Sequence, residues 1–154
     1  MEESSREVFF MIEQDTVRLL RECDAGAKMG VDSLNDVIGR VKDSQFRDAL
    51  ESSREEHEAL ADEIRGELNR YKDEGKDPAP MASAMSWLKT HAELAMDASD
   101  ATVADLMTDG CNMGVKSLNR YLNQYKAADE RSKDIAKRLI NQEQELAFQM
   151  RGYL

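Results

Sequence analysis

The chain repeats part of its own sequence, and this repeat limits the folds open to its 154 residues more than any other feature. The Thr-Val pair at 16–17 recurs at 102–103, and the Arg-Gly-x-Leu sequence at 65–68 recurs at 151–154, so both ends of the repeat are shifted by 86 positions. A repeated helical unit cannot bury its apolar face alone, and two copies are expected to pack against each other. We therefore expect one domain over residues 1–154 that contains two similar units.

A second repeated segment lies between these anchors. Met-Gly-Val-x-Ser-Leu-Asn at 29–35 returns at 113–119, displaced by 84 positions instead of 86. It places Gly30 and Gly114 at matching mid-helix positions, where glycine is unfavourable by about 1 kcal/mol relative to alanine. We expect the two helix backbones to approach closely at these glycines, across an axis close to twofold. The alternative is that both glycines are simply tolerated.

Composition and apolar spacing predict an all-α chain. Helix-forming residues dominate, and two prolines occur near the middle of the sequence. Apolar residues at alternating spacings of three and four form one stripe on each long helix. Ser99 or Asp100 is expected to cap the third long helix. The expected long helices span about 5–42, 44–72, 100–126 and 129–153, with a short helix containing Trp87 over about 81–96. We expect a four-helix bundle of two repeated hairpins, about 5–72 and 100–154, with the short helix in the connection 73–99.

Charge argues against several classes of partner. The net charge is −10, from 21 basic and 31 acidic residues, which disfavours nucleic acid and anionic membrane surfaces. No apolar run approaches the ~20 residues needed to cross a bilayer, and the N-terminal residues are polar and acidic, unlike a secretory leader. Cys23 and Cys111 fall in apolar helical stretches, and we expect them to be core residues and not reactive thiols. A reducing cytoplasm is the expected location.

The Asn-Met-Gly-Val-Lys-Ser-Leu stretch at 112–118, together with the two repeated hairpins, resembles small uncharacterised bacterial proteins of the ferritin-like superfamily. The resemblance covers nearly the whole chain and implies a ferritin-like four-helix bundle. It carries no assigned activity. In the ferritin-like carboxylate proteins, a Glu from each of two helices and a Glu-x-x-His sequence from each of the other two hold a pair of metal ions.

This chain departs from that ligand pattern. Arg54 stands three residues before His57, where the family pattern has Glu, and the residue 86 positions after His57 is Glu143. The nearest acids on the other two helices lie at the edge of the apolar stripe; they are Glu22 or Asp24, and Asp109. A metal pair needs around six convergent ligands. We therefore expect no di-metal site and no bound cofactor.

His57 and Glu143 both fall on apolar stripes in the middle of their helices. A buried carboxylate is costly unless it is paired, and equivalent positions of a twofold bundle lie near each other at its centre. The sequence therefore predicts a buried hydrogen-bonded pair. Two alternatives remain at this point: one or both side chains turn to the rim and reach water, or the two bind a single metal ion with a nearby acid such as Asp109.

Three functions are compatible with this sequence. The missing ligands favour a non-catalytic bundle that acts through protein contacts or self-association, without deciding whether the protein is an enzyme. Phe9 and Phe10 point about 100° apart on a helix and cannot both lie on one narrow core stripe, so at least one ring is exposed unless the Trp87 helix covers it. An apolar patch around 8–11, or the Trp87 helix, would supply the contact. A homodimer through this end is expected. The alternatives are a metal-binding or oxidoreductase ferritin-like protein with an atypical ligand set, and a bundle that binds a small ligand near Gly30 and Gly114.

Overall fold

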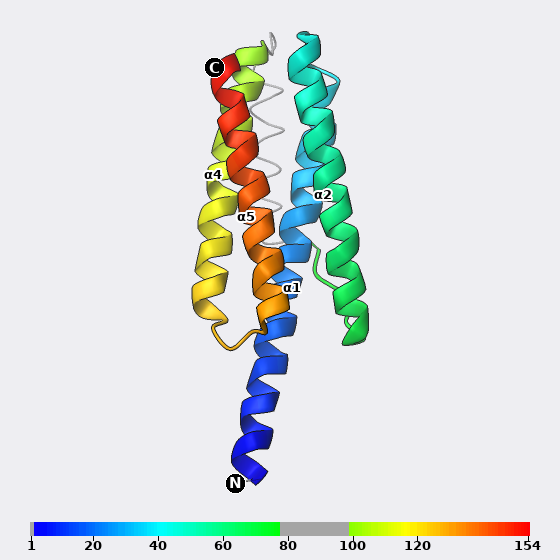
Figure 1. Cartoon of the computed structure of the whole chain (residues 1–154). Helices are drawn as coiled ribbons and strands as arrows, with labels where there is room; N and C mark the ends of the chain where they lie inside the picture. The colour runs from blue at the N-terminus through cyan, green and yellow to red at the C-terminus, as the bar shows by residue number, and fades with distance from the viewer. Residues whose placement is uncertain (1, 78–98) are drawn as a thin grey trace.

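The computed structural model describes residues 2–77 and 99–154, and over these ranges the chain is all-α. Its long helices are α1 (Glu2–Ile38), α2 (Ser44–Arg70), α4 (Asp100–Gln124) and α5 (Glu130–Met150), and a 3-10 turn, η2 (Arg151–Tyr153), follows α5 (Figure 1). The predictions of an all-α chain and of a four-helix bundle are confirmed. The short helix predicted around Trp87 lies outside the described residues.

The helices form two antiparallel pairs, α1 with α2 and α4 with α5 (Figure 1). The helices α1 and α5 run in one direction, and α2 and α4 run in the other. As a result, α2 ends at the opposite end of the bundle from the point where α4 begins, a distance that a short turn could not bridge. Further contacts join α1 to α4 and α5, and α2 to α5, so the two pairs enclose one interior.

At one end of the bundle, the beginning of α4 holds the turn between α1 and α2. The Asp100 carboxylate accepts hydrogen bonds from the backbone N–H groups of Lys42 and Asp43, each at 2.9 Å. These bonds favour the charged carboxylate and lower the pKa of Asp100, with the bond from Lys42 contributing most. Asp43 in turn caps α2 by accepting from the Phe46 N–H, and Ser99 caps α4 as predicted.

At the other end, α1 holds the turn between α4 and α5. The Asp15 carboxylate accepts from the Ala127 N–H at 3.0 Å, and the Thr16 hydroxyl accepts from the Asp129 N–H at 2.8 Å. Asp129 is also the N-cap of α5. The first helix of each hairpin therefore holds the turn of the other hairpin: Asp100 of α4 holds one turn, and Asp15 and Thr16 of α1 hold the other.

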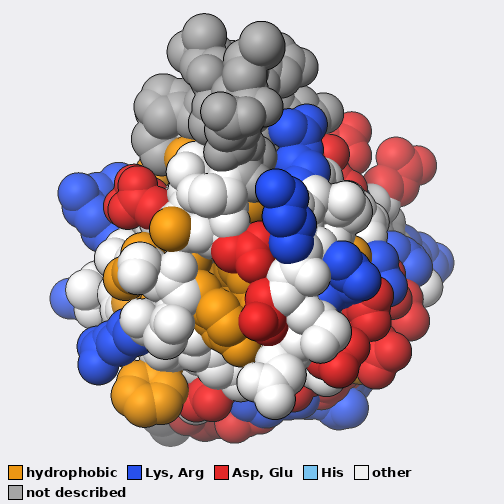
Figure 2. Space-filling model, turned by 90° about the horizontal axis from the view of Figure 1, so that it is seen from above, with side chains coloured by type: hydrophobic (Ala, Val, Ile, Leu, Met, Phe, Trp, Pro, Cys, Tyr) orange, Lys and Arg blue, Asp and Glu red, His pale blue; other side chains and the backbone are white. Residues whose placement is uncertain are grey.

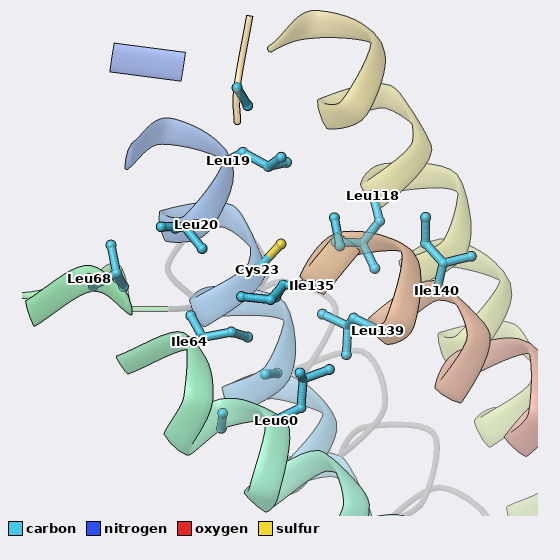
Figure 3. Packing of buried hydrophobic residues seen from close by; sticks show 14 residues of the cluster. Leu19, Leu20, Cys23, Leu60, Ile64, Leu68, Leu118, Ile135, Leu139 and Ile140 are labelled. Atoms are coloured by element: carbon cyan, nitrogen blue, oxygen red, sulfur yellow. The ribbon is translucent and has the colours of Figure 1, made fainter. Parts of the chain in front are cut away.

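The core consists of two apolar clusters stacked along the bundle. Figure 3 shows the first, near the α4–α5 turn, where side chains of all four helices point toward one another; its large members include Leu19, Leu20, Leu60, Ile64, Leu68, Leu118, Ile135 and Leu139. The second cluster includes Leu34, Phe46, Leu50, Met107, Leu146 and Met150. Fully burying one such side chain contributes about 1.5–3 kcal/mol. Cys23 lies in the first cluster and Cys111 in the second, as expected for core residues.

The surface of the bundle is strongly charged. Figure 2 shows the end at which α4 begins: acidic and basic side chains surround it, and apolar side chains are visible in a central hollow. Within the described parts of the chain, none of the helices has the length and apolar character that crossing a membrane requires.

The first turns of α1 project past the end of the bundle (Figure 1). Residues 2–13 are all exposed, and the first buried residue of α1 is Thr16. The sequence predicted that at least one of Phe9 and Phe10 would be exposed unless the Trp87 helix covered it; the two residues are 68% and 59% exposed. The projecting segment, residues 2–13, is therefore the part of α1 that lacks the packing its neighbours give to the rest of the helix.

Candidate functional site

One level of the interior, between the two apolar clusters, is built from small and polar residues. Gly30 comes from α1, Ser53 and His57 from α2, Gly114 from α4 and Glu143 from α5. His57 is completely buried, and Glu143 is 9% exposed. We call this level the polar layer. It interrupts the apolar stripes of all four helices at the same height.

The polar layer holds a hydrogen-bonded His57–Glu143 pair. The ring Nε2 of His57 lies 2.5 Å from Oε1 of Glu143, and Nδ1 lies 2.7 Å from the carbonyl oxygen of Ser53. Because a carbonyl can only accept, Nδ1 carries a proton and donates it to Ser53. A second proton lies between Nε2 and the carboxylate. The structure thus brings together the two residues that the sequence paired, and neither side chain turns to the rim.

Opposing effects set the pKa of His57. Burial is the largest and lowers the pKa, because it penalises the charged ring. The hydrogen bond to Glu143 and the charge of that carboxylate, together with the bond to Ser53, raise the pKa and outweigh burial. The net effect is a raised pKa, which favours the protonated ring beside Glu143. Removing one partner of such a buried pair typically costs 3–5 kcal/mol, since the other charge is then left unpaired.

The two repeated glycines make room for this pair. A Cβ added at Gly30 would lie 2.7 Å from Cδ2 of His57, and a Cβ at Gly114 would lie 3.4 Å from Oε2 of Glu143. The nearest atoms at both positions belong to these side chains and not to the backbone of the other glycine's helix. The close approach of the two backbones at Gly30 and Gly114 stays a prediction. The missing Cβ atoms accommodate side chains from α2 and α5.

A cavity of about 40 Å³ adjoins the pair between α1 and α4. Its walls are mainly apolar, with Met29, Leu106, Met107 and Leu118 among them, and Glu143 contributes a charged group. A water molecule needs roughly 10–15 Å³ by this measure, so the space suits about three waters or one small molecule.

The buried thiols are disfavoured as thiolates. Burial, aided by the charges of Glu22 and Asp24, raises the pKa of Cys23 to about 12. Burial also raises the pKa of Cys111, and the charge of Glu143 and a hydrogen bond to it act in the same direction. A thiol becomes a good nucleophile or metal ligand only when it ionises. Both cysteines therefore act as apolar core residues.

The candidate metal ligands do not converge. Within residues 2–77 and 99–154, no group of three or more His, Cys, Asp and Glu side chains is arranged to hold a metal ion. Asp109 is exposed on α4 and borders a surface depression with Met113 and Lys116, whereas His57 and Glu143 are buried. Asp109 therefore does not complete a site with the pair.

Asp24 has a structural partner that sequence reasoning missed. Its carboxylate, 2% exposed, lies 2.8 Å from Nζ of Lys28 and accepts the backbone N–H of Lys76 at 3.0 Å. Glu22 forms an ion pair with Nζ of the same Lys76. Gly75 has a φ of +85°, and a Cβ there would clash with the Asp24 carboxylate. These acids fasten the segment after α2 onto α1. In the sequence, Gly75 was the one local sign that this segment approaches α1 closely.

Comparison with protein-family models, with curated proteins and with solved structures finds no match to this chain.

The His57–Glu143 pair makes stability depend on pH. Because the pKa of native His57 lies above its ordinary value of 6.5, the unfolded chain releases this proton at a lower pH than the native protein does. The stabilisation is complete below about pH 6.5 and is lost as the pH rises through the native pKa. We expect the free energy of unfolding, measured by urea denaturation, to fall as the pH rises above about 6.5. The fall should be smaller in His57→Gln, which should also lose about 3–5 kcal/mol at pH 6. His91 is present in both chains, so their difference reports His57. Equal slopes in the two chains would contradict the assignment.

We expect glycine at position 30 to be required for the full stability of the bundle. In Gly30→Ala, the new Cβ displaces the His57 ring, and we expect a loss of about 1–3 kcal/mol in the free energy of unfolding. Gly66→Ala is the matched control, because no atom lies within 4 Å of a Cβ there; it should gain up to about 1 kcal/mol from helix propensity. Urea denaturation of both variants decides the point. A gain at both positions would show that the ring is not held where the structure places it.

Proposed function

We propose that the protein is a non-catalytic helical bundle that acts by self-association through the projecting segment of α1. The observation that carries this proposal is the exposed apolar run at its centre. Val8, Phe9, Phe10 and Met11 are each more than half exposed, and Ile12 is 36% exposed. Large apolar patches of this kind on soluble proteins commonly mark contact sites.

The projecting segment is poorly suited to remain without a partner. Five consecutive apolar residues cover every side of a helix, and a helix that is apolar all round is normally buried. Each Phe side chain can bury 150–250 Å² in a contact. The segment is also the end of α1 that has no packing from other helices, and such helix ends fray readily. Docking against another helix would remove both difficulties.

Charge near the apolar run favours a protein partner. Residues 2–15 contain five acidic side chains, and Arg6 is the one basic residue among them. Anionic lipid headgroups and nucleic-acid phosphates would be repelled by this end of the chain. A second copy offers apolar contact through the same run, and its Arg6 can pair with one of these acids.

We also propose that the bundle follows a ferritin-like plan without its metal ligands and that the two hairpins are copies of one unit. Two contacts between residues 86 positions apart support this. They are His57 with Glu143, and the side-chain amide of Gln142 with the carbonyl of Glu56. Self-contact between equivalent positions is what an axis close to twofold produces. On this proposal, the polar layer has a structural role and the function resides on the surface.

The self-association proposal is tested by removing the two exposed rings. We expect the native chain to be dimeric at tens of micromolar and the Phe9→Ser, Phe10→Ser double variant to be monomeric, because the double change removes the largest apolar groups of the segment. Size-exclusion chromatography with light scattering measures the mass, and circular dichroism checks that helix content is retained. Phe148→Ser is the control, since Phe148 is 62% exposed on α5 and should leave the dimer unchanged. A monomeric native chain, or a dimer indifferent to the double change, would end the proposal.

The cavity beside the polar layer favours a second candidate function, the binding of a small apolar molecule. Gly110 lines this cavity, and no atom lies within 4 Å of a Cβ placed on it. Xenon is a suitable probe because it enters apolar cavities. We expect xenon to shift the methyl NMR signals of Met107 and Leu118 in the native chain. The shift should be lost in Gly110→Leu, which fills the space, and kept in the control Gly66→Leu. Absence of any shift in the native chain would remove this candidate.

A further inference from the structure

The four residues Arg6, Phe9, Phe10 and Glu13 lie on one face of the projecting segment. Seven residues make nearly two helical turns, so Arg6 and Glu13 point in directions only about 20° apart. Phe9 and Phe10 lie between them along the helix and flank that direction on either side. All four are exposed on α1. We call this face the seam.

The order of residues along the seam is self-complementary. Arg6 and Glu13 are equally far from the midpoint between Phe9 and Phe10, about 5 Å along the helix in each direction. If a twofold axis passes through that midpoint, an antiparallel second helix brings its Glu13 opposite Arg6 and its Phe10 opposite Phe9. A parallel arrangement in register would instead place Arg6 against Arg6 and Glu13 against Glu13. Like charges placed opposite each other across an interface are costly, so the charges select the antiparallel arrangement.

From this pattern we infer that the seam binds a second copy of the same chain in an antiparallel, twofold-symmetric contact, with Arg6 of each copy paired to Glu13 of the other. The inference rests on the proposed function and adds the orientation and register of the contact. The contact is isologous, because the same surface is used by both copies, and it therefore closes at a dimer.

The inferred register sets the spacing of the two bundles along the helix axis. Gln14 is the first residue of α1 that falls outside the exposed class, and Gln14 of the second copy lies opposite Ser5. The packed parts of the two copies therefore begin nine residues apart along the helix, about 14 Å. Val8 and Ile12 continue the line of Thr16 and the core face of α1, so they border the gap between the two bundles.

Charge reversal tests the register. We expect Arg6→Glu and Glu13→Arg each to weaken the dimer about tenfold or more, because each change turns two attractive contacts per dimer into repulsive ones. The double variant, Arg6→Glu with Glu13→Arg, should recover a dissociation constant within about threefold of the native value, since the pairs are restored with opposite polarity. The loss of dimer affinity in each single variant should be smaller in 1 M salt, because salt screens exposed charges. Sedimentation equilibrium measures the dissociation constants.

The control for the change in net charge is Lys116→Glu, an exposed position on α4 that should leave the dissociation constant unchanged. A dimer that is indifferent both to the Phe9→Ser, Phe10→Ser change and to every charge reversal would overturn the proposed function. A dimer that depends on Phe9 and Phe10 but ignores the single reversals would overturn the register and leave self-association standing. Weakening by both single changes without recovery in the double variant would also overturn it. A monomeric native chain would overturn the proposed function itself.

Discussion

The buried pair of His57 and Glu143 needs hydrogen-bond partners and space, and much of the interior is arranged to provide them. The imidazolium carries two N–H groups and therefore needs two acceptors. Its own helix supplies the first, the carbonyl of Ser53, and α5 supplies the second. Bringing both side chains to the axis requires space on the remaining two helices, and this space exists because Gly30 and Gly114 lack a Cβ. One pair thus determines residues on all four helices.

The apolar clusters stabilise the fold, whereas the polar layer specifies how the helices are aligned. The two clusters contribute the larger favourable term through burial of apolar surface, but Leu-rich faces pack in more than one register with little change in energy. Sliding α2 past α5 by one turn would separate His57 from Glu143 and leave a buried charge unpaired, at a cost of several kcal/mol. The reciprocal bonds at the two ends, from Asp100 and from Thr16, select the same register. The alignment of the hairpins is therefore specified at three heights along the bundle.

The sequence predicted what depends on local pattern or on the internal repeat, and it missed a contact that depends on the path of a loop. The helices begin and end within a few residues of the predicted positions, because capping residues and apolar spacing are local signals. The pairing of His57 with Glu143 could also be predicted, because both residues interrupt an apolar stripe at equivalent positions of the repeat. The sequence did not predict that His57 lies against Gly30, because a missing Cβ does not reveal which group fills the space. The contact of Asp24 with the segment after α2 depends on a loop path that no local pattern encodes.

The exposure of Phe9 and Phe10 was also only partly predictable from the sequence. The adjacency of Phe9 and Phe10 predicted that one narrow core stripe could not bury both rings, but the exposure of both depends on where the neighbouring helices end. The turn between α4 and α5 is fastened to α1 at Asp15 and Thr16, so packing within the bundle begins there and the preceding turns are left outside it. The bonds that close the bundle thus also define the projecting segment. Because α1 is one continuous helix from Glu2 to Ile38, any contact that orders its start is expected to suppress fraying toward Thr16, which links association at the surface to stability at the end of the core.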